Sequence, residues 1–494
     1  MAELAGTLRR STSTLDSRFR FSENGTTLAR DTIAGVTTFI VMSYIIFVNP
    51  AILGFTGVKG LEDKGLPVQA VAASTALVAG VMTILMGLVT NRAYAIAPGL
   101  GINAIVAFSL VAGAGLGFPE AMGIIVMEGA LVTMLVLVGM RERVMRAIPL
   151  ELKKAIAIGI GLFIAFIGLV NSGIVVRGEG TPVELARFTT WPILVVLFGL
   201  VLTVTLRARG FPGDLLVGII VTTAFATLVN WATDYEAFPQ PGVARWPEDL
   251  VKAPDFSLIG EISFDSFATL GVVATFAWVF SLFLADFFDT MGTLVGVGKQ
   301  AGYLDERGEL PQIRRPLLVD SVAAMAGGAA SASSATTYIE SGAGVGVGGR
   351  TGWVSVVTGL LFLPFLFVGP LIQMVPFQAT APALIIVGWL MITTLVEAEE
   401  RAEEAEGVES RAARKLAGID FHNLAVGLSA ALAIMIMPFT YSITNGIAFG
   451  FIAYVVIRLA EGAWRSVHPL MYVAAGAFAL YFLVPLLQDT FDWI

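Results

Sequence analysis

Two acidic side chains interrupt a long apolar run in the second half of the chain. The stretch LADFFDTMG carries Asp286 and Asp289 three positions apart, and residues 266–285 before them contain no charged side chain. Residues three apart lie on one face of a helix. A third acid, Glu340, directly precedes the glycine-rich segment SGAGVGVGG. A charge at the centre of a membrane helix costs at least about 2.5 kcal/mol, so such acids generally face a binding site or a water-filled cavity.

The chemistry of a buried carboxylate narrows the ligand that it could bind. An ionised carboxylate accepts two parallel N–H donors, and its protonated form also donates an O–H. A flat heterocycle with adjacent N–H groups, such as guanine with its N1–H and exocyclic amine, fits this edge, whereas an anion would be repelled. Removal from water favours the protonated form, so an acid here can load and release a proton. For Asp289 we also weigh a hydrated position near the cytoplasmic mouth.

The composition is that of a protein with many membrane spans. Hydrophobic residues make up 56% of the 494 residues and charged residues only 14%, with a mean hydropathy of +0.81, whereas soluble domains carry about 25% charged residues. With no Cys and two His, we expect no metal site, no cofactor and no enzyme nucleophile. The motif GVGVGG lacks the βαβ context that nucleotide binding needs, and we expect no nucleic-acid partner.

The basic residues indicate how the chain is threaded through the lipid bilayer. With the N-terminus placed in the cytoplasm, all but six of the 30 Lys and Arg fall in cytoplasmic segments. Basic residues collect on the cytoplasmic side of membranes. We therefore expect a multi-pass protein of the cell membrane with a cytoplasmic N-terminus.

Two interrupted apolar segments occupy corresponding places in the two halves of the chain. The loop 232–265 separates seven expected spans from seven more, and an odd number per half makes the second half inverted relative to the first. The third span of each half is broken by Gly or Pro, AYAIAPGLGINAIVAF at 93–108 and ATTYIESGAGVGVGG at 335–349. Such breaks are tolerated where they line a cavity, and they point to the binding site of inverted-repeat transporters. Close helix packing through small residues is the alternative.

Several blocks of sequence resemble a known transporter family. They are RDTIAGVTTFIVMSYIIFVNP (30–50), AIAPGLGINA (95–104), FDTMGTLVGVGKQAGYLD (288–305), SSATTYIESGAGVGVGGRTG (333–352) and MPFTYSITNGIAFGFIAYVVIRL (437–459). These blocks resemble the azaguanine-type purine permeases, a branch of the nucleobase-cation symporter-2 group with the uracil-permease fold. The resemblance covers about residues 20–465.

The resemblance implies an all-α polytopic fold of two inverted repeats of seven spans, with a core domain and a gate domain. The broken segments in spans 3 and 10 would pair as two short antiparallel strands at the midplane. The implied parts are a cytoplasmic N-terminal segment 1–29, the core domain 30–140 and 266–378, the gate domain 141–232 and 379–461, an external loop 233–265, and an extra hydrophobic segment 466–488. We also consider a homodimer formed through the gate domain.

The implied function is proton symport of purine nucleobases, namely hypoxanthine, guanine and adenine, by elevator-like movement of the core against the gate. A nucleobase symporter for xanthine, urate or uracil is the alternative. By resemblance, Glu340 would hydrogen-bond the base, and Asp286 would contact it or carry the coupling proton, with Asp289 as the other candidate for the proton. The remaining implied site residues are Asn103, the backbone of Ile339 and Ser341, and the side chains of Thr38 and Tyr44.

Three further segments carry expectations about position. If a straight helix began at Ser266, Asp286 would lie about 30 Å along it, so a midplane position requires the membrane part to begin nearer Ala274–Ala277. The segment 468–487 either crosses the membrane or lies along its surface. The charged run 397–415 is typical of a solvated cytoplasmic helix.

Overall fold

The structure is a computed structural model that describes residues 15–56, 58, 60–139, 147–305, 310–406 and 419–491. The first fourteen residues of the expected N-terminal segment lie outside this part of the chain, and so does the charged run 397–415 beyond residue 406.

The first half of the chain consists mainly of helices, interrupted by one short strand and further along by a two-stranded hairpin. Its elements are α2 (Leu28–Met42), α3 (Ile45–Leu53), η1 (Glu62–Lys64), α4 (Val68–Thr90), β1 (Ile96–Pro98), α5 (Leu100–Ala104), the π-helical η2 (Ile105–Gly113), α6 (Phe118–Leu137), α8 (Leu150–Asn171), the hairpin of β2 (Val175–Val176) and β3 (Glu184–Leu185), α9 (Trp191–Ala208) and α10 (Asp214–Ala232).

The second half repeats this plan with an extra helix at the end. Its elements are α11 (Ser266–Thr269), α12 (Val272–Gln300), α13 (Arg314–Ala329), β4 (Ala335–Thr337), α14 (Ser341–Gly346), α15 (Gly352–Phe362), η3 (Leu363–Phe367), α16 (Gly369–Gln373), α17 (Phe377–Glu406), α19 (Leu424–Phe439), α20 (Ile443–Ala460), η4 (Trp464–Ser466) and α21 (Pro469–Phe491).

Within the described residues, eight helices are long and apolar enough to cross a membrane, and shorter apolar helices accompany them. The expected spans 314–331 and 336–349 are not among either set. The first corresponds to α13, in which Arg, Asp, Ser and Gly lower the hydropathy, and the second is divided between β4 and the six-residue α14. The protein is a multi-pass membrane protein.

The two broken segments pair with each other, as the family resemblance implied. Strand β1 runs antiparallel to β4 with Ile96 opposite Thr337 and Pro98 opposite Ala335. The free edge of β1 is satisfied by a side chain of α4, since Thr83 Oγ1 accepts from the Ile96 amide at 2.9 Å and donates to its carbonyl at 2.8 Å. Backbone groups must be hydrogen-bonded where lipid excludes water. Thr83 supplies the partners that Ile96 lacks on the side of β1 away from β4.

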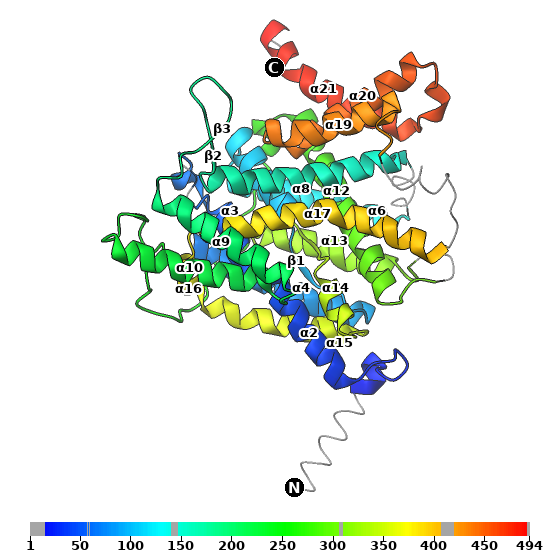
Figure 1. Ribbon diagram of the computed structural model, residues 1–494. Helices are drawn as coiled ribbons and strands as arrows, with labels where there is room; N and C mark the ends of the chain where they lie inside the picture. Colours follow the sequence, from blue (N-terminus) through cyan, green and yellow to red (C-terminus); the bar gives the residue numbers. More distant parts are fainter. Residues whose placement is uncertain are drawn as a thin grey trace.

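The helices pack in two groups. The first group joins α2 to α14 and α15, α4 to α3, α13, α15 and β1, α6 to α12, α13 and η2, α13 to β4, and α5 to η2. The second group joins α8 to α17 and α19, α19 to α20, and α9 to α10 and α17. In Figure 1, α8 and α17 run side by side through the middle of the molecule, with α19 and α20 at one end and α2 and α15 at the other. Contacts between the groups include α3 with α17, α5 with α8 and α12 with both α8 and α20.

The C-terminal segment 468–487 forms α21, which packs against α12 and α20 (Figure 1). Phe478 is 1% exposed, and its ring centroid lies 5.9 Å from that of Phe280 on α12 and 6.0 Å from that of Phe451 on α20. Helix α21 therefore connects one helix of each group through a single aromatic side chain.

Helix α12 does not extend back to Ser266. The chain forms the short α11, and a break at Gly271, whose φ is +80°, precedes the start of α12 at Val272. Only glycine adopts this backbone conformation without strain. Asp286 is consequently the middle residue of α12, which agrees with the expectation that the membrane part of this helix begins well after Ser266.

Candidate functional site

The paired strands and the helices that follow them line a small, half-open cavity of about 50 Å³. Tyr44, Asp289, Ile339 and Glu340 are the predicted site residues that line it. The other lining residues are Leu100, Gly101, Thr337, Tyr338, Val387 and Met391. Six of the ten residues, including Glu340 at the N-cap of α14, therefore come from the two broken segments 93–108 and 335–349.

Glu340 is held by a residue from the other end of the chain. Tyr44 lies between α2 and α3, and its hydroxyl donates a 2.6 Å hydrogen bond to Glu340 Oε1. Tyr44 is buried and Glu340 is half-buried. Because this bond occupies Oε1, the other carboxylate oxygen, Oε2, is available to accept hydrogen bonds from other donors. Glu340 thus has a fixed acceptor geometry before any ligand arrives.

The structure separates the two acids of α12. Asp289 lines the cavity with Glu340, whereas Asp286 is fully buried and is not among the lining residues. Three residues turn an α-helix by about 300°, which leaves the two side chains about 60° apart. The carboxylate expected near Glu340 was that of Asp286, and the structure places that of Asp289 there.

Two other predicted residues, Ser341 and Thr38, lie behind the lining of the cavity. The Ser341 hydroxyl accepts from the Ala95 amide at 2.9 Å and donates to the Tyr338 carbonyl at 2.6 Å, which joins the two strands at their ends. Thr38 of α2 lies against Gly344 of α14, where an added Cβ would be 2.2 Å from its Oγ1. Ser341 therefore links the ends of the two strands, and Thr38 lies at the contact between α2 and α14.

Asn103 has no hydrogen-bond partner among the described residues, although it is fully buried. It lies on α5 one turn after Leu100, which lines the cavity, so the two share a helix face. Buried amides are nearly always paired. An unpaired buried amide beside a cavity marks a place where a ligand or water can supply the missing partners.

A fourth acid, Asp320 of α13, organises the strand β4. Its Oδ1 accepts from the amide and the hydroxyl of Thr337 at 2.8 and 2.7 Å, and its Oδ2 accepts from Thr290 Oγ1 at 2.7 Å. Thr290 also contacts Thr336 Oγ1 at 2.8 Å. Asp320 therefore ties together β4 and the turn of α12 that carries Asp289.

Asp320 and Glu128 are two further buried acids that were not among the predicted site residues, and Glu128 lies fully buried on α6. Both lie inside expected spans, Asp320 in LLVDSVAAMAGG and Glu128 in AMGIIVMEGALV. The rule that singled out Asp286, namely an acid within an apolar run, applies to both of them and would have found them.

The cavity lies at the boundary between the two groups of helices. Val387 and Met391 come from α17 of the second group, and the other lining residues come from the first. Pockets for small ligands usually measure 300–1,000 Å³. A cavity of about 50 Å³ must therefore widen to admit a heterocycle, and separation of the two groups would widen it.

Residues 30–406 match the profile of a permease family. This chain belongs to the nucleobase-cation symporter-2 permeases. The adenine permease AdeQ of Escherichia coli is 36% identical to the permease over 470 residues, covering 94% of this chain and 96% of AdeQ. The guanine/hypoxanthine permease PbuG of Bacillus subtilis is 37% identical over 468 residues, covering 94% of this chain and 98% of PbuG. The permease is accordingly a transporter and not an enzyme.

Solved structures with the same fold belong to distant transporters. The transmembrane domain of the cyanobacterial bicarbonate transporter BicA superposes with a TM-score of 0.57 at 14% identity, covering 83% of the permease and 96% of that domain. The murine anion transporter Slc26a9 in its inward-facing state superposes with a TM-score of 0.58 at 10% identity, covering 88% of the permease and 68% of that chain. At these identities the likeness shows the fold alone.

Proposed function

We propose that the permease imports purine nucleobases, namely hypoxanthine, guanine and adenine, by proton symport. One observation carries the proposal: Glu340 and Asp289 share a cavity at the boundary between two separately packed groups of helices. The relatives named as adenine and guanine/hypoxanthine permeases support the choice of purines. Two acids on one wall favour a ligand that offers N–H donors, and they disfavour an anion.

Glu340 is the proposed recognition group for the edge of the base. With one oxygen held by Tyr44, the carboxylate presents Oε2 to an N–H donor such as N1–H of guanine or hypoxanthine. Hydrogen bonds to an ionised acceptor are worth about 1.5–3 kcal/mol. The unpaired amide of Asn103 supplies a donor and an acceptor for another edge of the ring.

Asp286 and Asp289 are the proposed proton carriers. Asp286 is fully buried in the middle of α12, and Asp289 lies one turn further on in the cavity wall. A carboxyl group can take up one proton as an O–H and release it again, which is what proton coupling requires. We assign the base contact to Asp289 and the coupling proton to Asp286, with transfer between them along one helix face.

Transport follows from movement of one group of helices against the other. We assign the first group to the core domain (30–140 and 266–378) and the second to the gate domain (141–232 and 379–461). The core carries the strand pair, Glu340 and Asp289, while Val387 and Met391 of α17 belong to the gate. We place the N-terminus in the cytoplasm, so that the start of α2 and the end of α17 face inward.

Uptake of radiolabelled hypoxanthine and guanine in a host that lacks its own purine uptake tests the proposal. We expect accumulation that a protonophore abolishes, and loss of uptake in Glu340→Gln with normal expression. Competition by unlabelled xanthine, urate and uracil distinguishes the alternative specificities. Unimpaired uptake by Glu340→Gln, or accumulation that ignores the protonophore, would contradict the site or the coupling.

A further inference from the structure

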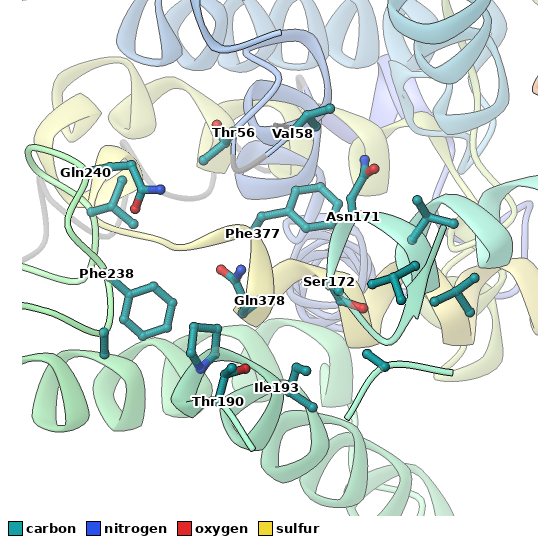
Figure 2. A pocket seen from close by; sticks show the side chains of 18 of the residues that line it. Thr56, Val58, Asn171, Ser172, Thr190, Ile193, Phe238, Gln240, Phe377 and Gln378 are labelled. Carbon is teal, nitrogen blue, oxygen red and sulfur yellow. The ribbon is translucent and has the colours of Figure 1, made fainter. Parts of the chain in front are cut away.

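A second, larger cavity opens on the face of the protein opposite the start of α2. It measures about 820 Å³ and lies among the ends of α3 and α8, the β2–β3 hairpin, the starts of α9 and α17, and the loop 237–243. Its size is within the usual range for small-ligand pockets. Figure 2 shows Gln378 between Phe238 and Ser172, with Asn171 and Gln240 on either side of Phe377.

We call this the outer cavity, and the cavity that contains Glu340 the inner cavity. Helix α17 contributes to the lining of both. Gln378 and Phe377 begin α17, and Val387 and Met391 of the same helix line the inner cavity about 15 Å further on, at 1.5 Å per residue. The two cavities share no lining residue. Between them α17 contacts α3, and Leu384 is 1% exposed. A packed layer thus separates an open outer cavity from the inner site.

The lining of the outer cavity has the chemistry of a binding site for a neutral heterocycle. Asn171, Gln240 and Gln378 each offer a donor and an acceptor on one planar group. Asn171 Nδ2 is buried and has no hydrogen-bond partner among the described residues. Phe238 and Phe377 add flat apolar surface on which a base can stack.

The charge of this lining is opposite to that of the inner site. Arg177 and Arg187 are its charged members, and among the described residues no acid lines the outer cavity. A protonated base would be repelled here, whereas a neutral base with ring carbonyls or nitrogens accepts hydrogen bonds from the arginines and amides. The outer cavity is therefore suited to bases before they meet the acids.

We propose that the outer cavity is a nucleobase subsite that holds a neutral purine on its way to Glu340. The inference rests on the proposed function, because it places the outer cavity on the outside of the membrane and on the import route. A base bound here is already desolvated and oriented along α17. When the core moves outward, the inner site approaches the end of α17 at which Gln378 lies.

Labelling of an introduced thiol tests the subsite directly. The chain contains no cysteine, so Gln378→Cys introduces a unique thiol in the outer cavity. We expect an impermeant, charged methanethiosulfonate reagent to modify it from outside intact cells, and saturating hypoxanthine to slow the modification at least threefold. Ser257→Cys, in an exposed part of the loop on the same face, is the matched control and should be modified without protection.

A second variant separates binding in the outer cavity from movement caused by binding at Glu340. In Glu340→Gln combined with Gln378→Cys we expect the protection by hypoxanthine to persist, although uptake is lost. Absence of protection in both backgrounds, while the wild-type protein still transports purines, would overturn the subsite and leave the proposed function intact. Protection that vanishes only in the Glu340→Gln background would also overturn it, because it would reflect movement alone. A wild-type protein that transports no purine would refute the proposed function itself.

The direction of transport provides an independent measurement. For Asn171→Ala we expect the half-saturation concentration for uptake from outside to rise about fivefold, because the variant loses one hydrogen bond to the base. The half-saturation concentration for uptake into inside-out vesicles, which present their cytoplasmic face to the medium, should stay unchanged. Equal changes in both directions, or no change in either, would contradict a role on the outer side only.

Discussion

The Tyr44 hydroxyl donates a 2.6 Å hydrogen bond to Glu340 Oε1, although the two residues are 296 positions apart. Tyr44 lies at the junction of α2 and α3, and Glu340 lies at the junction of β4 and α14. The bond therefore joins two breaks in regular structure, and it orients the carboxylate that faces the cavity.

We predict that Tyr44→Phe raises the half-saturation concentration for purine uptake about fivefold to tenfold. The ring is retained and only the donor to Glu340 is lost, so the carboxylate becomes free to rotate. Uptake kinetics at matched expression measure the effect. Tyr303→Phe is the control, because that partly buried hydroxyl donates to the Arg350 carbonyl and accepts from the Ala93 amide, and neither partner lines the cavity. Equal kinetics for Tyr44→Phe and the wild type would exclude the orienting role.

Asp320→Asn should lower both stability and transport. The carboxylate accepts from the Thr337 amide, the Thr337 hydroxyl and the Thr290 hydroxyl. In the Asn variant an NH2 group replaces one of the two oxygens, and it cannot accept a hydrogen bond from these donors. We expect a loss of about 1–3 kcal/mol in the free energy of unfolding, seen as a lower midpoint of thermal unfolding in detergent, and a raised half-saturation concentration.

Asp31→Asn is the matched control for Asp320. Asp31 is also fully buried, and it accepts from Thr26, from the Arg350 amide and from both the amide and hydroxyl of Thr351, at the far end of α2 from Tyr44. We expect a similar loss of stability without a change in the half-saturation concentration. If both variants alter substrate affinity alike, Asp320 has no special connection to the site.

Replacement of each of the two acids of α12 by Asn should impair transport in a different way. We predict that Asp289→Asn weakens binding of the base, so that uptake and counterflow exchange both decline, because Asp289 lines the cavity. Asp286→Asn should retain counterflow exchange but lose accumulation against a gradient, because it removes the proposed proton carrier. Counterflow in proteoliposomes with and without a pH gradient separates the two, and identical defects would refute this division.

Gly344→Ala tests the close approach of α14 to α2. An added Cβ would lie 2.2 Å from Thr38 Oγ1 and 2.6 Å from the Ala34 carbonyl oxygen, so backbone must move. We expect a cost of about 1–3 kcal/mol and slower transport, measured as thermal stability and uptake rate. Gly292→Ala on α12, where an added Cβ meets nothing within 4 Å, should match the wild type.

Phe478→Ala tests α21 as a connection between the two helix groups. The side chain is 1% exposed between Phe280 and Phe451, and burial losses of this kind cost about 3–5 kcal/mol. We expect a lower thermal midpoint and an altered transport rate with an unchanged half-saturation concentration. Phe439→Ala, which removes a 75% exposed ring, should have no such effect.

Much of the site was visible in the sequence because its features are costly in lipid. An acid inside an apolar run and a Gly or Pro break inside a span each leave unpaired groups that only a cavity or a partner can compensate. These local costs singled out the two broken segments together with Asp289, Glu340 and Asn103, whereas the pairing of the segments that became β1 and β4 was implied by the family resemblance. Asp320 obeys the same rule and was overlooked.

What the sequence by itself determined was the membrane class, the two broken segments and a short list of intramembrane acids, since each follows from the hydropathy and backbone chemistry of neighbouring residues. The tertiary structure alone decided that Asp289 faces the cavity, that Tyr44 holds Glu340, that α21 packs on α12 and α20, and that a second cavity lies at the start of α17. The reason is geometric. The rotation of a helix about its axis is set by packing against distant segments, and residues three apart on α12 differ by only about 60°.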